Sequence, residues 1–171
     1  MALLDLVIYP DDPLTRSADP FDGIGPAETK LAASMLETMT AYDGVGLAGP
    51  QVGVAKRVIV CREPERQPLC LFNPRIITRE GQETGEEGCL SLPDLYAMVP
   101  RATCIRATGL DLRGKPVEFE ARDLLARIIQ HEVDHLDGVV FLDRLDVLSR
   151  QAKLVEWNAI RARMAAAIRE T

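Results

Sequence analysis

Two histidines with three residues between them impose the strongest constraint on how this chain can fold. They are its only histidines, and they belong to the run HEVDH at residues 131–135. Apolar residues recur at helical spacing from Leu124 to Val133. Asp123 precedes this segment as an expected N-cap, and Gly138 follows it. Residues four apart on a helix share one face, so both imidazoles can reach one metal ion, with Glu132 beside them as a general base.

A catalytic metal needs a third protein ligand and one position left for water. Metalloproteases that take a third histidine six residues after the second are excluded, because Phe141 occupies that position. Thermolysin-like proteases use a glutamate on a later helix, and Glu156 lies at a suitable distance along the chain. A thiolate from elsewhere is the alternative, and it makes Cys89 the competing candidate.

The four cysteines have different sequence surroundings. Cys61, Cys70 and Cys104 fall within or at the start of apolar, β-rich runs, which indicates small core residues. Cys89 lies in the run EEGCLS at residues 86–91, directly after a glycine that lets a ligand come close. Neighbouring acids weaken a free thiol as a nucleophile, whereas a metal ion would hold it as a thiolate. The run therefore favours Cys89 as a metal ligand over Cys89 as a nucleophile.

A glycine-rich run, GVGLAGPQ at residues 44–51, matches the dinucleotide fingerprint G-x-G-x-x-G. The fingerprint needs a strand before it and a helix that starts within it, whereas here a helix is expected before it and Pro50 interrupts its end. We therefore predict no nucleotide cofactor. The run is better interpreted as bare backbone on which an extended peptide can pair, with Gln51 supplying an amide donor nearby.

The remaining pattern predicts an α+β fold. Leu3–Tyr9 is expected to form a short strand, and apolar spacing from Pro26 to Met39 predicts an amphipathic helix. After the metal-binding helix we expect a short apolar strand and a last helix from about Ser149 to Arg169. Helices and strands do not alternate as they do in βαβ units. Further strands are expected at residues 56–61, 69–72, 102–107 and 116–120.

Length and charge add broader expectations. The 171 residues suit one domain, which we divide into a catalytic core at 1–146 and a C-terminal helix of basic character at 147–171. The net charge is −6, yet this last segment carries five basic residues, a weak indication of an anionic partner. With no export signal and no long apolar run, we expect a cytoplasmic protein with free thiols and no membrane partner.

Taken in order and spacing, the three runs resemble the signature motifs of bacterial peptide deformylases, G-x-G-[apolar]-A-A-x-Q, E-G-C-[apolar]-S and H-E-x-D-H. The likeness covers roughly residues 5–145. It implies a peptide-deformylase-like fold, with small β-sheets packed around a central metal-binding helix, an N-terminal helix and a C-terminal helix. One departure is Gly49, where the family usually has a second alanine; the missing methyl is expected to loosen the loop that carries Gln51.

The resemblance implies a metal-dependent hydrolase that removes the N-terminal formyl group from the formyl-methionine of newly made polypeptides. It implies one divalent metal ion held by Cys89, His131 and His135, with Fe²⁺ as the native ion and Zn²⁺, Ni²⁺ or Co²⁺ able to take its place. Coordination chemistry alone would favour zinc at such a site. The implied partners are the N-formyl-methionyl nascent peptide and the ribosome, which the C-terminal helix would contact.

Catalytic and binding roles follow from the same resemblance. Glu132 would carry the proton, while the Gln51 amide and the backbone N–H of Leu90 would stabilise charge on the formyl oxygen. An acetyl methyl would clash where the formyl hydrogen fits. The residues expected to contact the substrate are Val45, Gly46, Gly88, Leu125 and Ile128, with Tyr96 or the methylenes of Arg101 as further candidates for the methionine pocket.

Residues around the metal ligands have expected supporting roles. Glu87 or Asp134 would accept the free N–H of a ligand imidazole, and Arg101 would pair with Glu87. Asp134 is equally well explained as a helix-surface acid. A rival of another class is an idle ribosome-binding module with a structural metal. It is disfavoured because structural sites take four protein ligands, and only three good ones are visible.

Overall fold

The computed structural model describes residues 3–169, and residues 1, 2, 170 and 171 lie outside the described part. Its larger sheet is antiparallel and has the strand order β1-β2-β3-β6-β7. These strands are β1 (Gly46–Ala48), β2 (Val58–Cys61), β3 (Leu69–Glu80), β6 (Cys104–Leu110) and β7 (Pro116–Arg122). A smaller antiparallel sheet pairs β4 (Glu83–Cys89) with β5 (Leu92–Arg101).

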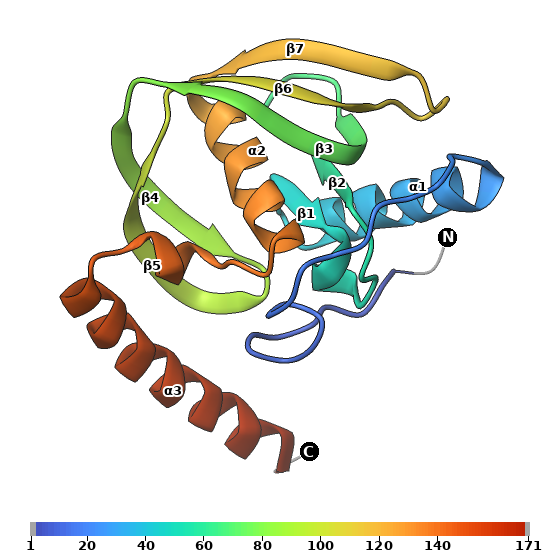
Figure 1. The fold of residues 1–171 in the computed structure, drawn as a ribbon. Helices are drawn as coiled ribbons and strands as arrows, with labels where there is room; N and C mark the ends of the chain where they lie inside the picture. The colour runs from blue at the N-terminus through green and yellow to red at the C-terminus, as the bar shows by residue number, and fades with distance from the viewer. Residues whose placement is uncertain (1–2, 170–171) are drawn as a thin grey trace.

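Three α-helices complete the α+β architecture and confirm the expected fold class. They are α1 (Pro26–Ala41), α2 (Asp123–Leu136) and α3 (Val147–Arg169), and two short 3₁₀ helices are η1 (Gly49–Val52) and η2 (Phe141–Arg144). Figure 1 shows α2 in the centre of the molecule, between the larger sheet and the β4–β5 hairpin. The central metal-binding helix implied by the three motifs is therefore present.

Alternation along β2 explains how the larger sheet is covered on both faces. Val58 and Val60 belong to the cluster formed with α1, while Ile59 and Cys61 belong to the cluster formed with α2. Successive side chains of a strand point to opposite faces, so four consecutive buried residues serve two cores. The continuous apolar run in the sequence reflects burial on both sides.

Helix α2 is unusual because both its apolar and its polar sides are buried. Ile129, Val133 and Leu136 pack on the larger sheet. The opposite side carries the buried polar residues His131 and Asp134, which contact Glu87 of β4 and Arg101 of β5, while Glu132 lies on the flank that faces Gly46 of β1. Buried polar groups need hydrogen bonds or a metal to offset the loss of water. The fold therefore collects polar chemistry between α2 and the β4–β5 hairpin.

The C-terminal helix α3 is held to the body by few side chains. Trp157 and Ile160 are buried against residues of β5 and η2, and the Trp157 indole N–H donates to the Tyr9 carbonyl at 3.3 Å. Most other α3 positions are exposed. Within residues 3–169, no helix is both long and apolar enough to cross a membrane.

Several expected elements differ in the structure. Leu3–Tyr9 is extended but not a strand, because its backbone makes isolated bonds, such as Val7 N–H to the Gln51 carbonyl, instead of a ladder. The short apolar strand expected after α2 is the 3₁₀ helix η2. Asp123 is the first residue of α2 and not its N-cap, which is Arg122. The Asp123 N–H donates instead to the Thr103 carbonyl at 2.8 Å.

The β4–β5 hairpin is not predicted by the sequence pattern, although it carries half of the site described below. Its first strand reads ETGEEGC, a composition poor in residues that favour strands. It forms because Glu83–Gly88 pairs continuously with Tyr96–Arg101 on β5. This pairing joins two segments of the chain, so the strand propensity of either segment alone does not predict it.

Candidate metal centre and its cavity

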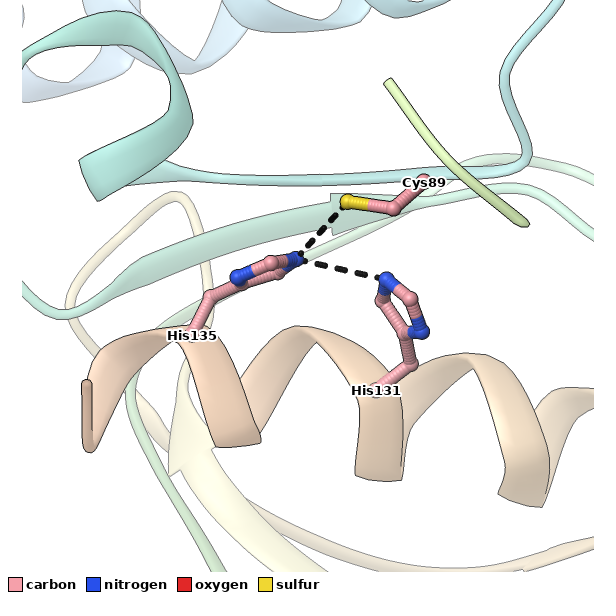
Figure 2. Close-up of side chains that lie close together, drawn as sticks. All are labelled: Cys89, His131 and His135. Carbon is pink, nitrogen blue, oxygen red and sulfur yellow. Dashed lines mark hydrogen bonds between the residues drawn. The ribbon is translucent and has the colours of Figure 1, made fainter. Parts of the chain in front are cut away.

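Cys89, His131 and His135 converge between the end of β4 and helix α2. Their ligand atoms all lie within 4.8 Å of one another. The Cys89 Sγ is 3.3 Å from His135 Nε2, and the two histidine Nε2 atoms are also 3.3 Å apart. Figure 2 shows the thiol and both rings directed toward one point above the helix. The structure thus brings Cys89 to two histidines that lie more than forty positions later in the chain.

The donor set and its spacing fit a small divalent ion. Four-coordinate ligands at about 2.0–2.3 Å from a metal lie roughly 3.3–3.8 Å from each other, which matches both distances of 3.3 Å. Two imidazole nitrogens and a sulfur facing one another would otherwise be left with opposed lone pairs. Sulfur and imidazole ligands suit zinc, iron, nickel or cobalt better than magnesium or calcium.

Glu87 on β4 determines which nitrogen of His131 faces the other ligands. Its Oε2 lies 2.8 Å from His131 Nδ1, and a carboxylate can only accept, so Nδ1 carries the hydrogen and Nε2 offers its lone pair. Burial alone would raise the pKa of Glu87, but hydrogen bonds from His131 and Arg101 lower it to about 2. Glu87 is therefore a buried carboxylate at neutral pH.

Arg101 holds Glu87 as the sequence predicted. Its Nε and Nη2 donate to the two Glu87 oxygens at 2.8 and 3.0 Å. Its Nη1 donates to Asp134 at 2.6 Å, and Asp134 is also paired with Arg144. Asp134 therefore binds arginines and not a ligand imidazole, so the expectation that it accepts from a histidine is wrong. It is also buried, unlike a helix-surface acid.

Glu132 lies beside the metal ligands without a complete set of partners. It is buried, and its Oε2 has no hydrogen-bond partner within residues 3–169. Burial raises the pKa of its carboxyl to about 7, although a cation held nearby would favour the charged form. A Cβ on Gly46 would collide with this carboxylate, so glycine at that position is what admits Glu132. The group is placed to exchange a proton with a molecule in the site.

Gln51 approaches the same point from η1. Its side-chain oxygen accepts from the Ala48 N–H at 2.8 Å, which orients the amide so that Nε2 donates to the Cys89 sulfur at 3.4 Å. Gly49, in the same turn, has no room for a methyl group: a Cβ would lie 2.5 Å from the Lys56 carbonyl oxygen. The expectation that the missing alanine loosens this loop is therefore wrong.

A cavity of about 840 Å³ opens onto the metal group. His131 and Glu132 are among its lining residues, and the free edge of β1 forms part of its wall. The predicted substrate-contact residues Val45, Gly46, Gly88 and Ile128 line it, as do Gln51, Leu90 and Tyr96, whereas Leu125 and the further candidate Arg101 do not. Leu125 instead packs in the core shared with the larger sheet, and its neighbour Leu124 faces the cavity.

The remaining alternatives from the sequence are resolved by position. Glu156 lies on the exposed part of α3, where its carboxylate accepts from Lys153 at 2.7 Å, so it is not the third ligand. Cys61 is buried, and Cys70 and Cys104 are partly buried. Burial raises the pKa of Cys70 to about 12, so this thiol stays protonated. All four cysteines are free.

The sequence pattern did not single out Arg127, although its spacing from His131 could have indicated a residue near the metal group. It lies four residues before His131 on α2 and lines the cavity. Its guanidinium donates to Glu87 at 2.9 Å. The same i,i+4 spacing that pairs the histidines also places Arg127 on their face of the helix.

Comparison with known proteins agrees with the geometry of the metal group. The family model described as polypeptide deformylase matches residues 3–151. The chain is 45% identical over 152 residues to the peptide deformylase of Desulforudis audaxviator, covering 88% of this chain and 99% of that one.

Solved structures agree with the sequence relatives. The crystal structure of peptide deformylase from Thermus thermophilus superposes with a TM-score of 0.88 at 42% identity, covering 94% of this chain and 96% of that chain. A Met-Ala-Ser-bound class I type b peptide deformylase from Acinetobacter baumannii gives 0.81 at 36% identity, covering 84% and 99%. By sequence and by fold, this chain belongs to the peptide deformylase family, as an enzyme that carries Cys89, His131 and His135 as its metal group.

Proposed function

We propose that this enzyme hydrolyses the formyl group from the N-terminal formyl-methionine of newly made polypeptides. The main support is the opening of the cavity onto Cys89 and His131 of the metal group, where the Oε2 of Glu132 has no hydrogen-bond partner within residues 3–169. A structural metal site would be closed by a fourth protein ligand, and within residues 3–169 the group has three. This argues against an idle module with a structural metal.

The native ion is proposed to be Fe²⁺, as the resemblance implies, with Zn²⁺, Ni²⁺ or Co²⁺ able to occupy the same ligands. When bound, such an ion lowers the pKa of water toward about 7 and polarises a carbonyl oxygen. Cys89 and the two histidine Nε2 atoms would hold it, and Glu87 would keep His131 in the required tautomer.

The chain itself supplies proton transfer and charge stabilisation. Glu132 accepts a proton from the attacking water and delivers it to the departing amine. The Gln51 amide and the backbone N–H of Leu90 donate to the formyl oxygen as negative charge develops there, and one such donor is worth about 3 kcal/mol. Burial of Glu132 keeps bulk water from competing for that proton.

Substrate binding uses the free edge of β1 and the cavity wall. The peptide backbone pairs with residues 45 and 46, as an added strand would. The methionine side chain enters between Ile128 and Gly88, with Leu124 and Tyr96 at the cavity wall. The related Acinetobacter baumannii enzyme was crystallised with Met-Ala-Ser bound, a peptide whose N-terminal residue is methionine.

Formate release from a formylated peptide tests the proposal directly. The protein is purified without air, its iron content is measured, and it is incubated with formyl-Met-Ala-Ser or acetyl-Met-Ala-Ser. We expect formate from the first peptide and negligible acetate from the second, because the resemblance implies an acyl site that takes the formyl hydrogen and not a methyl group. No formate from the metal-loaded protein, or equal release of both acids, would refute the function.

The ribosome is the proposed partner of α3, which carries Arg161 and Arg163 on its exposed surface. Truncation after Asp146 would remove the buried Trp157, so charge reversal is the cleaner test. Arg161→Glu with Arg163→Glu is expected to weaken ribosome binding. It should also reduce the salt dependence of binding, by about one unit of slope for each phosphate that the helix no longer neutralises.

The matched control for this prediction is Arg106→Glu with Arg122→Glu, which reverses two exposed charges on β6 and β7, away from α3. Sedimentation of each variant with ribosomes over a range of salt concentrations measures the effect. Equal weakening by both pairs would indicate general charge attraction without a docking role for α3. We place this activity in the cytosol, where nascent chains emerge and thiols such as the four free cysteines stay reduced.

A further inference from the structure

Arg127 connects the two parts of the chain that hold the metal ligands, and we propose that it is a positioning residue for the metal site. Two of the ligands lie on α2, whereas Cys89 lies at the end of β4. The inference rests on the proposed function only in requiring that Cys89, His131 and His135 bind a metal ion.

Arg127 uses its guanidinium to reach three acceptors on the β4–β5 hairpin. Nη1 donates to Glu87 Oε1 at 2.9 Å and to the Val99 carbonyl at 2.8 Å. Nη2 donates to the Glu83 carbonyl at 2.8 Å. Only 15% of the side chain is exposed. A planar fork can satisfy several acceptors in fixed directions, so one residue of α2 ties both strands of the hairpin to the helix.

Through Glu87, the same contacts act on a metal ligand. Glu87 Oε1 accepts from both Arg101 and Arg127, so two guanidinium groups hold that oxygen. Its Oε2 is thereby directed at His131 Nδ1, at 2.8 Å. A carboxylate that can rotate would let the imidazole turn away from the ion. Groups that orient a metal ligand typically contribute 10–100-fold to metal affinity.

The sequence of β4 leaves space for this arginine. A Cβ on Gly85 would lie 3.1 Å from the Arg127 guanidinium carbon, closer than side chains normally pack. Gly85 therefore lets the guanidinium pass across the strand to the Glu83 carbonyl. The glycine and the arginine fit each other across the interface between hairpin and helix.

The test is a zinc affinity measurement on the full-length protein. Zn²⁺-loaded wild type and Arg127→Met are titrated with a chromophoric chelator, and the dissociation constant for Zn²⁺ is determined. We expect the constant to rise about tenfold in Arg127→Met, the lower end of the usual range, because Arg101 still holds Glu87. Methionine keeps the apolar stem but removes the charge and all donors.

Arg57→Met is the matched control. Arg57 also has a largely buried side chain, 18% exposed, and donates to Asp137 and to the Leu136 carbonyl at the other end of α2. Its loss should lower the melting temperature and change zinc affinity less than about twofold, because no metal ligand depends on it. An unchanged constant in Arg127→Met, or an equal rise in Arg57→Met, would overturn the proposal. Wild type that binds no zinc would instead contradict the metal site of the proposed function.

Gly85→Ala provides a second route to the same conclusion if Arg127→Met fails to fold. The added methyl forces the guanidinium to shift by a few tenths of an ångström from its acceptors, without removing any charge. Zinc affinity is expected to weaken about threefold to tenfold, between wild type and Arg127→Met. A folded Gly85→Ala protein with wild-type zinc affinity would contradict the positioning role.

Discussion

Glu132→Gln is expected to keep its metal and to lower kcat by about 10²- to 10⁴-fold. Glutamine has nearly the same shape as glutamate, so it fits beside Gly46, but its amide cannot accept the proton that the attacking water must lose. Cys89, His131 and His135 remain as ligands, and metal content should stay near one ion per chain. Formate release and metal analysis on the same sample measure both quantities.

Glu156→Gln is the matched control, because it makes the same chemical change at an exposed acid on α3. It should turn over like wild type. The interpretation of Glu132 would be wrong if Glu132→Gln kept near-normal turnover. Loss of metal from Glu132→Gln would assign this residue a structural role in place of proton transfer.

Cys89→Ala is expected to lose the metal itself. The substitution removes the only sulfur ligand of the group and leaves two imidazoles, fewer than the three protein ligands of a catalytic site. The dissociation constant should rise by more than the roughly 100-fold upper limit for groups that only support a ligand, or about 2.7 kcal/mol. Activity should fall with metal occupancy, in contrast to Glu132→Gln.

The same chelator titration applied to Glu156→Ala completes the comparison. Glu156 lies away from the metal group and pairs with Lys153, so its removal should leave the affinity unchanged. Metal bound normally by Cys89→Ala would refute the ligand assignment. A large loss of metal from Glu156→Ala would restore the thermolysin-like alternative that the geometry excludes.

Two strands show where prediction from local pattern succeeded and where it failed. The β2 segment is a run rich in β-branched residues and was expected as a strand. β4 contains three glutamates and two glycines, and only its pairing with β5 makes it a strand. Strand propensity therefore did not predict the hairpin that carries Cys89, although Cys89 itself was identified from its motif.

Local sequence was sufficient for α1, α2, α3 and the two histidine ligands, because helical periodicity and motif spacing are properties of short segments. It left Cys89 and Glu156 as alternatives for the third ligand, and the resemblance to peptide deformylases pointed to Cys89. The tertiary fold decided which groups surround those ligands. In the fold, Asp134 pairs with Arg101 and Arg144. Leu124, and not Leu125, lines the cavity. Arg127 donates a hydrogen bond to Glu87. These outcomes depend on how α2 is rotated against a hairpin some forty residues away, and such long-range packing leaves no local pattern in the chain.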